Sequence, residues 1–385
     1  MTRRRFPFTT YANSMNTSSM TSDAPIAGVQ GFIVPMHCTD LPATMQFFIA
    51  RLGFRLDAIF PADGPRNAIL SRDGFRLRLG LDVRNGIDTL NVLCDDPAQL
   101  PGEISELVAP NGVVVRLMHA NPPMMLPPTR QQLVLSHAGS DAHWSVGRAG
   151  MRYRDLLPER HGGAFIASHI RILEGGPVPD YVHFHKIRFQ TIFCRKGWVR
   201  LVYEGQGEPF ILEAGDCVLQ PPEIRHRVLE SSAGAEVIEL GSPAEHITMA
   251  EHGMTLPNSV YDPDYEFNGQ RFVRHVAKNA SWKPWKSPAF VVADTGIGAA
   301  TDGLAGVRVV RPLGDGQQAS RMHDTEFCFF FVLAGSFDVA QGEQHWRLTA
   351  DDSIAIPGNL PYTFRQCSAD LELLEVTLPA DFSLA

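Results

Sequence analysis

The sequence lacks three features that would assign it to a familiar class at once. It has no apolar run approaching the roughly 20 residues that a transmembrane helix needs. Its 34 basic and 42 acidic residues give a formal net charge of −8, which gives no reason to expect nucleic acid or an anionic membrane surface as a partner. Its six cysteines are scattered, without a C-x-x-C pair, and this predicts reduced thiols in a cytoplasmic protein. The expected partner is a small-molecule substrate.

Residues 1–29 are predicted to be a disordered tail. Three arginines, Arg3 to Arg5, precede a tract rich in Ser, Thr, Asn and Met. The tract has no apolar segment of the kind that a secretory signal requires. The same composition is compatible with a weak organellar transit peptide, or with a true start at Met15 or Met20. We expect disorder, because few apolar residues are available to offset the cost of ordering the chain.

Residues 30–120 are predicted to form a mixed α/β module. A strand over 31–37 precedes a helix over 41–52, for which Asp40 is the expected N-cap and Gly53 the expected end. Strands follow over 68–71, 75–79 and 89–93, and a turn at 110–112 leads into the last strand.

This βαβββ order, with the turn at 110–112, resembles the glyoxalase/bleomycin-resistance (vicinal oxygen chelate) family. The positions at which that family carries metal ligands hold Ile33 and Arg116 here. The resemblance therefore implies a module without a metal of its own, which serves packing, dimerisation or lid formation.

The remainder of the chain is predicted to be mainly β. Residues 121–163 and 246–290 read as linkers, the first of which also covers a barrel. Between and after them, short strands recur with Gly and Pro turn signals over 164–245 and 291–385. This punctuation is typical of jelly-roll barrels. The predicted fold class is two jelly-roll β-barrels behind an N-terminal α+β module.

Four residues of the first barrel form a candidate metal site: His183, His185, Gln190 and His226. Side chains two residues apart on a strand point to the same face, so the first two imidazoles lie together. Curling of the barrel brings the other two residues to that face. Imidazole nitrogens and an amide oxygen are ligands for a divalent transition metal. The alternative is a barrel interior in which the four side chains satisfy one another by hydrogen bonds.

The second barrel repeats the first with altered residues. Gly197 lies twelve residues after His185, and Gly335 lies twelve after His323. In this register the four candidate ligand positions become Arg321, His323, Cys328 and Tyr362. A guanidinium has no lone pair to offer and repels a divalent cation. The second barrel is therefore predicted to be metal-free.

Two motifs of the first barrel resemble those of the cupin superfamily. The first motif reads Gly176…His183-x-His185-x(4)-Gln190-x(6)-Gly197, with Gln where the family has Glu. The second reads Gly215-x(5)-Pro221-x-Glu223-x(2)-His226. The chain looks like a bicupin with an intact N-terminal barrel and a degenerate C-terminal barrel.

Replacing Glu by Gln190 leaves the full charge of a divalent metal uncompensated, which favours anionic oxygen donors as ligands. Asp180 and Glu230 are candidates for holding a histidine or for proton transfer, and Arg188 for contacting a substrate carboxylate at the barrel mouth. No catalytic residue is assigned beyond the weak candidates Arg188 and Glu230.

The resemblance leaves three functions open. Bicupins with one three-histidine site resemble Fe(II) ring-cleaving dioxygenases, which makes a dioxygenase on a small oxygenated organic acid the first hypothesis. Cupins with a Gln ligand resemble redox-neutral isomerases and lyases that act on uronates or hydroxy- and keto-acids. The third hypothesis is a non-catalytic small-molecule-binding protein. The expected cofactor is one divalent transition metal, Fe(II) first and Mn, Ni or Zn as alternatives, and the expected assembly is a homodimer.

Overall fold

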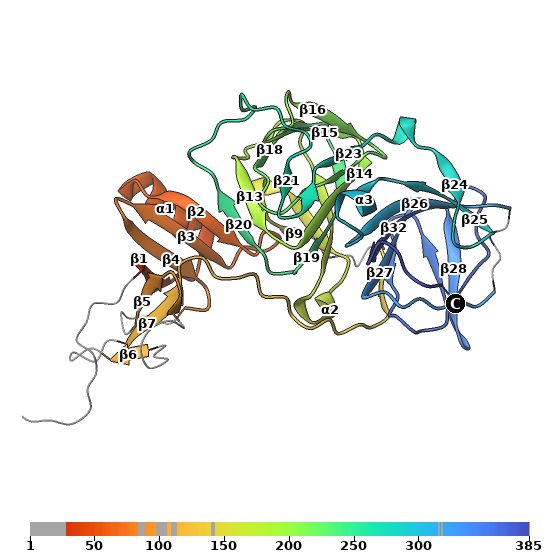
Figure 1. Cartoon of the computed structure of the whole chain (residues 1–385), viewed down its shortest axis with the longest axis horizontal. Coiled ribbons are helices and arrows are strands. Elements are labelled where there is room, and N and C mark those ends of the chain that lie inside the picture. The colour runs from red at the N-terminus through yellow and green to blue at the C-terminus, as the bar shows by residue number, and fades with distance from the viewer. Residues whose placement is uncertain are drawn as a thin grey trace, which may run out of the picture. The chain divides into compact units, whose positions relative to one another are not determined.

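The structure, a computed structural model, describes residues 28–83, 89–97, 106–108, 114–139, 143–314, 316 and 319–384. Most of the predicted tail and the predicted turn at 110–112 lie outside these residues. Strands far outnumber helices in the described part of the chain, as predicted (Figure 1). None of its helices has the length and apolar character needed to cross a membrane.

The chain divides into two compact units, residues 1–32 with 88–122 and residues 33–87 with 123–385. In the first unit, β5 (Thr89–Cys94) runs parallel to β7 (Val114–His119). Strand β6 (Glu106–Val108) pairs antiparallel with β7. On these strands Arg116 forms an ion pair of 2.6 Å with Glu106.

The elements predicted for the first part of the α/β module lie in the second unit, except that their first strand starts at Val29 in the first unit. Their order is β1 (Val29–His37), α1 (Leu41–Leu52), β2 (Arg55–Phe60), β3 (Asn67–Arg72) and β4 (Phe75–Gly80). The predicted caps of α1 are confirmed. The carboxylate of Asp40 accepts the N–H of Ala43 at 2.9 Å, and Gly53 takes the left-handed conformation with φ 65°.

The first barrel consists of two facing antiparallel sheets, coloured yellow to green in Figure 1. The candidate histidines lie on one sheet and Gln190 lies on the other. The first sheet contains β16 (Phe210–Glu213), β15 (Trp198–Tyr203), β18 (His226–Ser231), β13 (His183–Lys186) and β20 (Ile247–Ala250), with β12 (Gly176–Pro177) beside β18. The second contains β23 (Val273–His275), β17 (Cys217–Leu219), β14 (Phe189–Lys196), β19 (Ala235–Ser242), β11 (Ile166–Ile172), β10 (Arg152–Asp155) and β9 (Ser145–Val146).

The second barrel repeats this arrangement and appears in blue in Figure 1. Its larger sheet contains β24 (Trp282–Pro284), β25 (Phe290–Asp294), β26 (Gly306–Pro312), β32 (Glu372–Leu378), β27 (Phe327–Ala334), β30 (Ser353–Ala355) and β8 (Val134–Ser136). Its smaller sheet contains β29 (Gln344–Thr349), β28 (Ser336–Gln341) and β31 (Thr363–Arg365). The remaining elements are α2 (Arg160–Gly163), α3 (Ile297–Ala300), the hairpin of β21 (Glu266–Phe267) and β22 (Gln270–Arg271), and the 3₁₀ turns η2 (Arg148–Gly150) and η3 (Ala277–Asn279).

Strand β27 explains why the two barrels share a core. It is buried on both faces, so its run of phenylalanines does not alternate with polar residues. Phe327, Phe329 and Phe331 pack into a cluster with residues of the first barrel, and the ring of Phe327 stacks on Phe165 at 4.2 Å. Phe330 points the other way, into the interior of the second barrel.

The segment predicted as the first linker contributes strands to both barrels. Strand β8 pairs with β30 of the second barrel, and β10 pairs with β11 of the first. Between them, η2 carries Arg148, which lines the cavity of the first barrel. The segment predicted as the second linker also contributes strands, since β20 pairs with β13 and with β2.

Candidate metal centre

The three candidate histidines converge in the first barrel. His183 lies directly opposite His226 on the neighbouring strand, and His185 shares the face of His183. The ring centroids of His183 and His226 lie 4.2 Å apart, and His185 is 5.2 Å from each. One ring nitrogen of each residue lies within 4.8 Å of those of the other two, a spacing that one ion can bridge.

Each histidine is held through its Nδ1 atom. The Nδ1 of His183 lies 2.8 Å from the carbonyl oxygen of Tyr181, and that of His226 lies 3.0 Å from the carbonyl oxygen of Ile224. A carbonyl only accepts, so both Nδ1 atoms carry the proton and both Nε2 atoms carry the lone pair. The Nδ1 of His185 lies 3.0 Å from the hydroxyl of Thr248, which permits the same tautomer. Holding the second ring nitrogen in this way is the usual support of a metal-binding histidine.

The free nitrogens fit a metal. The Nε2 of His183 is buried and has no hydrogen-bond partner in the described part of the chain. The sequence offered the alternative that the four candidate side chains satisfy one another by hydrogen bonds. That arrangement leaves the Nε2 of His183 without a partner, which is unfavourable for a buried polar atom.

Burial also keeps the three imidazoles neutral, which metal binding requires. It lowers the pKa of His226 to about 4. The pKa of His183 lies well below its ordinary value because of burial and then the charge of Arg148. That of His185 is lowered well below its ordinary value by burial and then by His246, whose ring lies 5.1 Å away.

These shifts predict that chelator-treated protein loses stability as the pH falls from about 6.5 to 4. The pKa of His226 is about 4 in the folded chain and about 6.5 in the unfolded one, so the unfolded chain binds more protons in this window. His226 alone contributes roughly 3 kcal/mol by this route. Urea unfolding at pH 7, 5.5 and 4.5 measures the effect, and His226→Asn should reduce the slope. A free energy of unfolding that is constant over this range contradicts the prediction.

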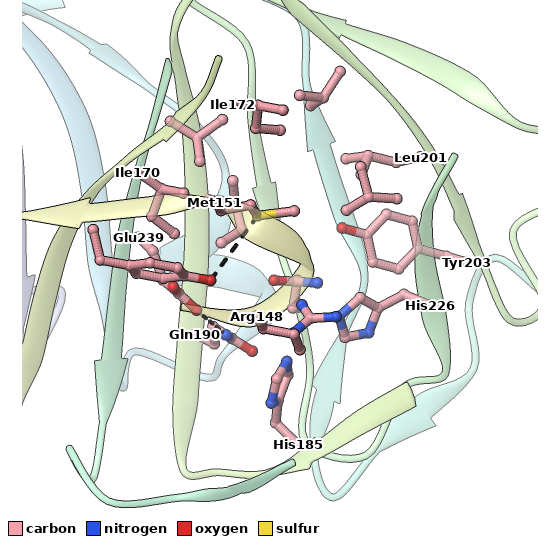
Figure 2. Close-up of a pocket in the computed structure, with 16 residues that line it drawn as sticks. Arg148, Met151, Ile170, Ile172, His185, Gln190, Leu201, Tyr203, His226 and Glu239 are labelled. Atoms are coloured by element: carbon pink, nitrogen blue, oxygen red, sulfur yellow. Dashed lines mark hydrogen bonds between the residues drawn. The ribbon is translucent and has the colours of Figure 1, made fainter. Parts of the chain in front are cut away.

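Gln190 is oriented by a buried glutamate. Its Nε2 donates to Oε1 of Glu239 at 2.5 Å, while its own Oε1 is buried without a partner among the described residues. The amide oxygen is thus available to a cation in the cavity that it shares with His185 and His226. Figure 2 shows Glu239 beside Gln190, with Arg148 between Gln190 and His226. Burial raises the pKa of Glu239.

Arg148 and Asp180 form a buried ion pair next to His183. Arg148 is bonded to Asp180, which also accepts the N–H of Val228 at 2.9 Å and lies 3.7 Å from Nδ1 of His183. Burial acts to raise the pKa of Asp180, but the charge of Arg148 and the backbone N–H groups of Val228 and Tyr181 outweigh it and leave the pKa lowered. Asp180 was a sequence candidate for holding a histidine, but the hydrogen-bond partner of the Nδ1 of His183 is the carbonyl of Tyr181. Arg148 was not a candidate, because no pattern marks one arginine in an irregular segment.

The cavity is small. Its volume is about 70 Å³, which admits a few water-sized groups. Apolar side chains make up half of the lining residues. The polar ones are Arg148, Tyr153, His185, Gln190, Tyr203, Gln220, His226 and Glu239.

The two weak catalytic candidates lie elsewhere. Arg188 forms an ion pair of 3.3 Å with Glu326 of the second barrel. Glu230 pairs with Arg200 at 3.1 Å, and both side chains are more than a third exposed. Neither residue lines the cavity.

The second barrel keeps the register without the ligands. Arg321 and Tyr362 form a bridge between strands, as His183 and His226 do. Cys328 pairs with Thr377, as Gln190 pairs with Gly241. In the described part of this barrel no three potential ligands gather around one point.

Among the described residues, one other cluster has the spacing of a metal site: His169, Glu236 and Asp351. Arginines surround it. Arg171 contacts Glu236 at 3.0 Å and Arg195 contacts Asp351 at 3.1 Å. We interpret this cluster as an ion-pair network that joins the two barrels, because cations already neutralise the carboxylates.

Comparison with known proteins places a family match in the second barrel. Residues 307–377 match the family model described as Cupin domain. No curated protein matches the chain.

Similar solved structures include a mutant of oxalate decarboxylase from Bacillus subtilis, with 14% identity and a TM-score of 0.48 over 66% of this chain and 78% of that one. An oxalate decarboxylase formate complex from Lactobacillus farciminis has 14% identity and a TM-score of 0.48 over 69% of this chain and 91% of that one. The cupin match thus falls on the second barrel, which lacks the histidine cluster. The two barrels are linked in sequence by the internal repeat described above.

Proposed function

We propose that the first barrel binds one divalent transition metal through His183, His185 and His226, with Gln190 as the fourth ligand. We further propose that the chain uses it to transform a small oxygenated organic acid. The observation that carries the proposal is that the Nδ1 atoms of the three histidines all have partners, which leaves the Nε2 atoms for a cation. When bound, such a metal supplies a Lewis acid that polarises a substrate oxygen.

The charge of the site favours an acidic substrate. Three neutral imidazoles and an amide do not compensate a +2 charge, and Arg148 is already paired with Asp180. An anionic oxygen donor therefore gains attraction on entering the cavity. The volume of about 70 Å³ limits the part of the substrate that enters to a few atoms.

Two reaction types fit this centre. The first is a dioxygenase with Fe(II), which is what a bicupin with one three-histidine site resembles. The second is a redox-neutral isomerase or lyase, which the neutral Gln190 favours. For the second, Glu239 lines the cavity and can hold or release a proton, which a redox-neutral rearrangement needs.

An oxygen-uptake screen separates the two. Protein loaded with Fe(II) or with Mn(II) is incubated with catechols, hydroxy-acids and uronates under air and under nitrogen. A dioxygenase consumes O₂ and substrate together with Fe(II) and stops under nitrogen. An isomerase or lyase converts substrate under nitrogen and accepts Mn(II). Metal-loaded protein that converts none of these substrates under either gas contradicts an enzymatic role on small organic acids.

We also propose roles for the rest of the chain. Residues 30–120 would be a glyoxalase-like module without its own metal, since Ile33 and Arg116 hold the ligand positions and Arg116 is paired with Glu106. The boundaries 121–163, 164–245, 246–290 and 291–385 would delimit linker, first barrel, linker and second barrel. The assembly would be a homodimer.

A further inference from the structure

Arg321 stands in the second barrel where His183 stands in the first. Two hydrogen bonds fix its backbone. The N–H of Arg321 donates to the carbonyl oxygen of Tyr362 at 2.9 Å, and the N–H of Tyr362 donates to the carbonyl oxygen of Arg321 at 2.8 Å. The same pairing in the first barrel holds His183 against His226. Only 6% of Arg321 is exposed. The strand register thus places a permanent positive charge inside the second barrel.

The guanidinium of Arg321 has no acceptor among the described residues. None of its three nitrogens makes a hydrogen bond, and the side chain forms no ion pair with any of these residues. Its central carbon lies over aromatic rings, 4.8 Å from that of Trp285 and 5.5 Å from that of Phe364. Ring faces attract the charge but supply no lone pair to the N–H groups. A buried charged donor without an acceptor is unfavourable, and an anion bound beside the guanidinium would supply both the acceptor atoms and the opposite charge.

The buried carboxylate of Glu375, in the same barrel, attracts Arg321 from beyond ion-pair distance but accepts no hydrogen bond from it. Oε2 of Glu375 accepts N–H groups from Arg308 at 3.3 Å and from Trp285 at 3.4 Å. Its Oε1 has no partner in the described part of the chain, but Glu375 makes no ion pair with Arg321. Arg308 also lies 3.6 Å from Asp294, so its charge is compensated. Burial raises the pKa of Glu375, which weakens its repulsion of an incoming anion.

We propose that the second barrel binds a small carboxylate through Arg321. A carboxylate matches the planar fork of a guanidinium with two parallel hydrogen bonds. A monoanion balances the single charge, and the surrounding rings suit its apolar remainder. Arg321 would thus provide in the second barrel the attraction for organic acids that a metal provides in the first. The two sites are independent, because Arg321 is not part of the histidine cluster.

Acetate is the probe, and the melting temperature of the full chain is the readout. Metal is removed with a chelator so that acetate cannot bind to it, and chloride keeps the ionic strength constant. At ten times its half-saturating concentration, acetate should raise the melting temperature by about 2 °C. Neutral acetamide should not raise it. His183→Ala should keep the rise, which separates this site from the first barrel. A melting temperature that acetate does not raise above chloride overturns the proposal.

Variants of Arg321 locate the effect. Arg321→Met fills the same volume among the rings without the charge and should abolish the rise with acetate. The matched control is Arg311→Met, which removes an exposed arginine of the same barrel that pairs with Glu372 at 2.8 Å, and it should keep the rise. Should Arg321→Met not fold, Arg321→Lys keeps the charge but loses the fork, and should need at least about tenfold more acetate. An equal response in wild type and either Arg321 variant overturns the proposal.

Discussion

His183→Ala is expected to reduce the metal content of the purified protein from about one transition metal per chain to less than a tenth of that. The side chain supplies one of three nitrogens that lie within 4.8 Å of one another. Two imidazoles and an amide oxygen do not hold a divalent metal through purification, because a stable site uses at least three strong protein ligands. Elemental analysis of protein purified without chelators measures the loss.

The matched control is His323→Ala. His323 is buried like His185, and its Nδ1 is held by the hydroxyl of Thr325 at 2.9 Å, but the positions equivalent to His183 and His226 hold Arg321 and Tyr362. Its removal should leave the metal content unchanged. If both variants lose metal equally, the loss reports general damage to the fold, and if neither does, the histidine cluster is not the site.

Arg148→Met is expected to destabilise the protein by about 3–5 kcal/mol. Arg148 is the ion-pair partner of Asp180, whose side chain is fully buried. Removing the arginine leaves a carboxylate without compensation at a place where water cannot reach it. Chemical denaturation of the metal-free protein measures the change, so the loss of stability is separated from any loss of metal.

The double variant Arg148→Met with Asp180→Asn identifies the cause. Asparagine removes the charge but keeps an oxygen for the N–H of Val228, so most of the stability should return. Arg200→Met is the control, because it breaks the half-exposed pair with Glu230 and should cost no more than about 1 kcal/mol. A cost for Arg148→Met no larger than that of Arg200→Met would show that the buried pair contributes nothing.

The histidine cluster could be predicted from the sequence because local geometry determines most of it. Strand alternation places His183 and His185 on one face whatever the rest of the chain does. His226 could be predicted from the spacing of the second motif. The second barrel repeats that spacing, with Tyr362 at the equivalent position. The caps of the first helix were predicted for the same reason, since Asp40 and Gly53 act within one turn of their own positions.

The groups around the cluster could not be predicted, because they depend on pairing between distant strands. Glu239 meets Gln190 only because Gln190 pairs with Gly241, which places Glu239 diagonally opposite on the same face. Arg148 reaches Asp180 because β9 and β10, on either side of it, pair with each other and with β11 of the first barrel. Strands β9 and β10 are two and four residues long, too short for a periodic pattern to mark them.

The most direct test of the central claim is the metal content of the wild-type chain. Protein purified without chelators, or apo-protein incubated with Fe(II), Mn(II), Ni(II) or Zn(II) and then desalted, is measured by elemental analysis. The account predicts close to one transition metal per chain. A chain that is metal-free after purification and takes up none of these four metals contradicts it.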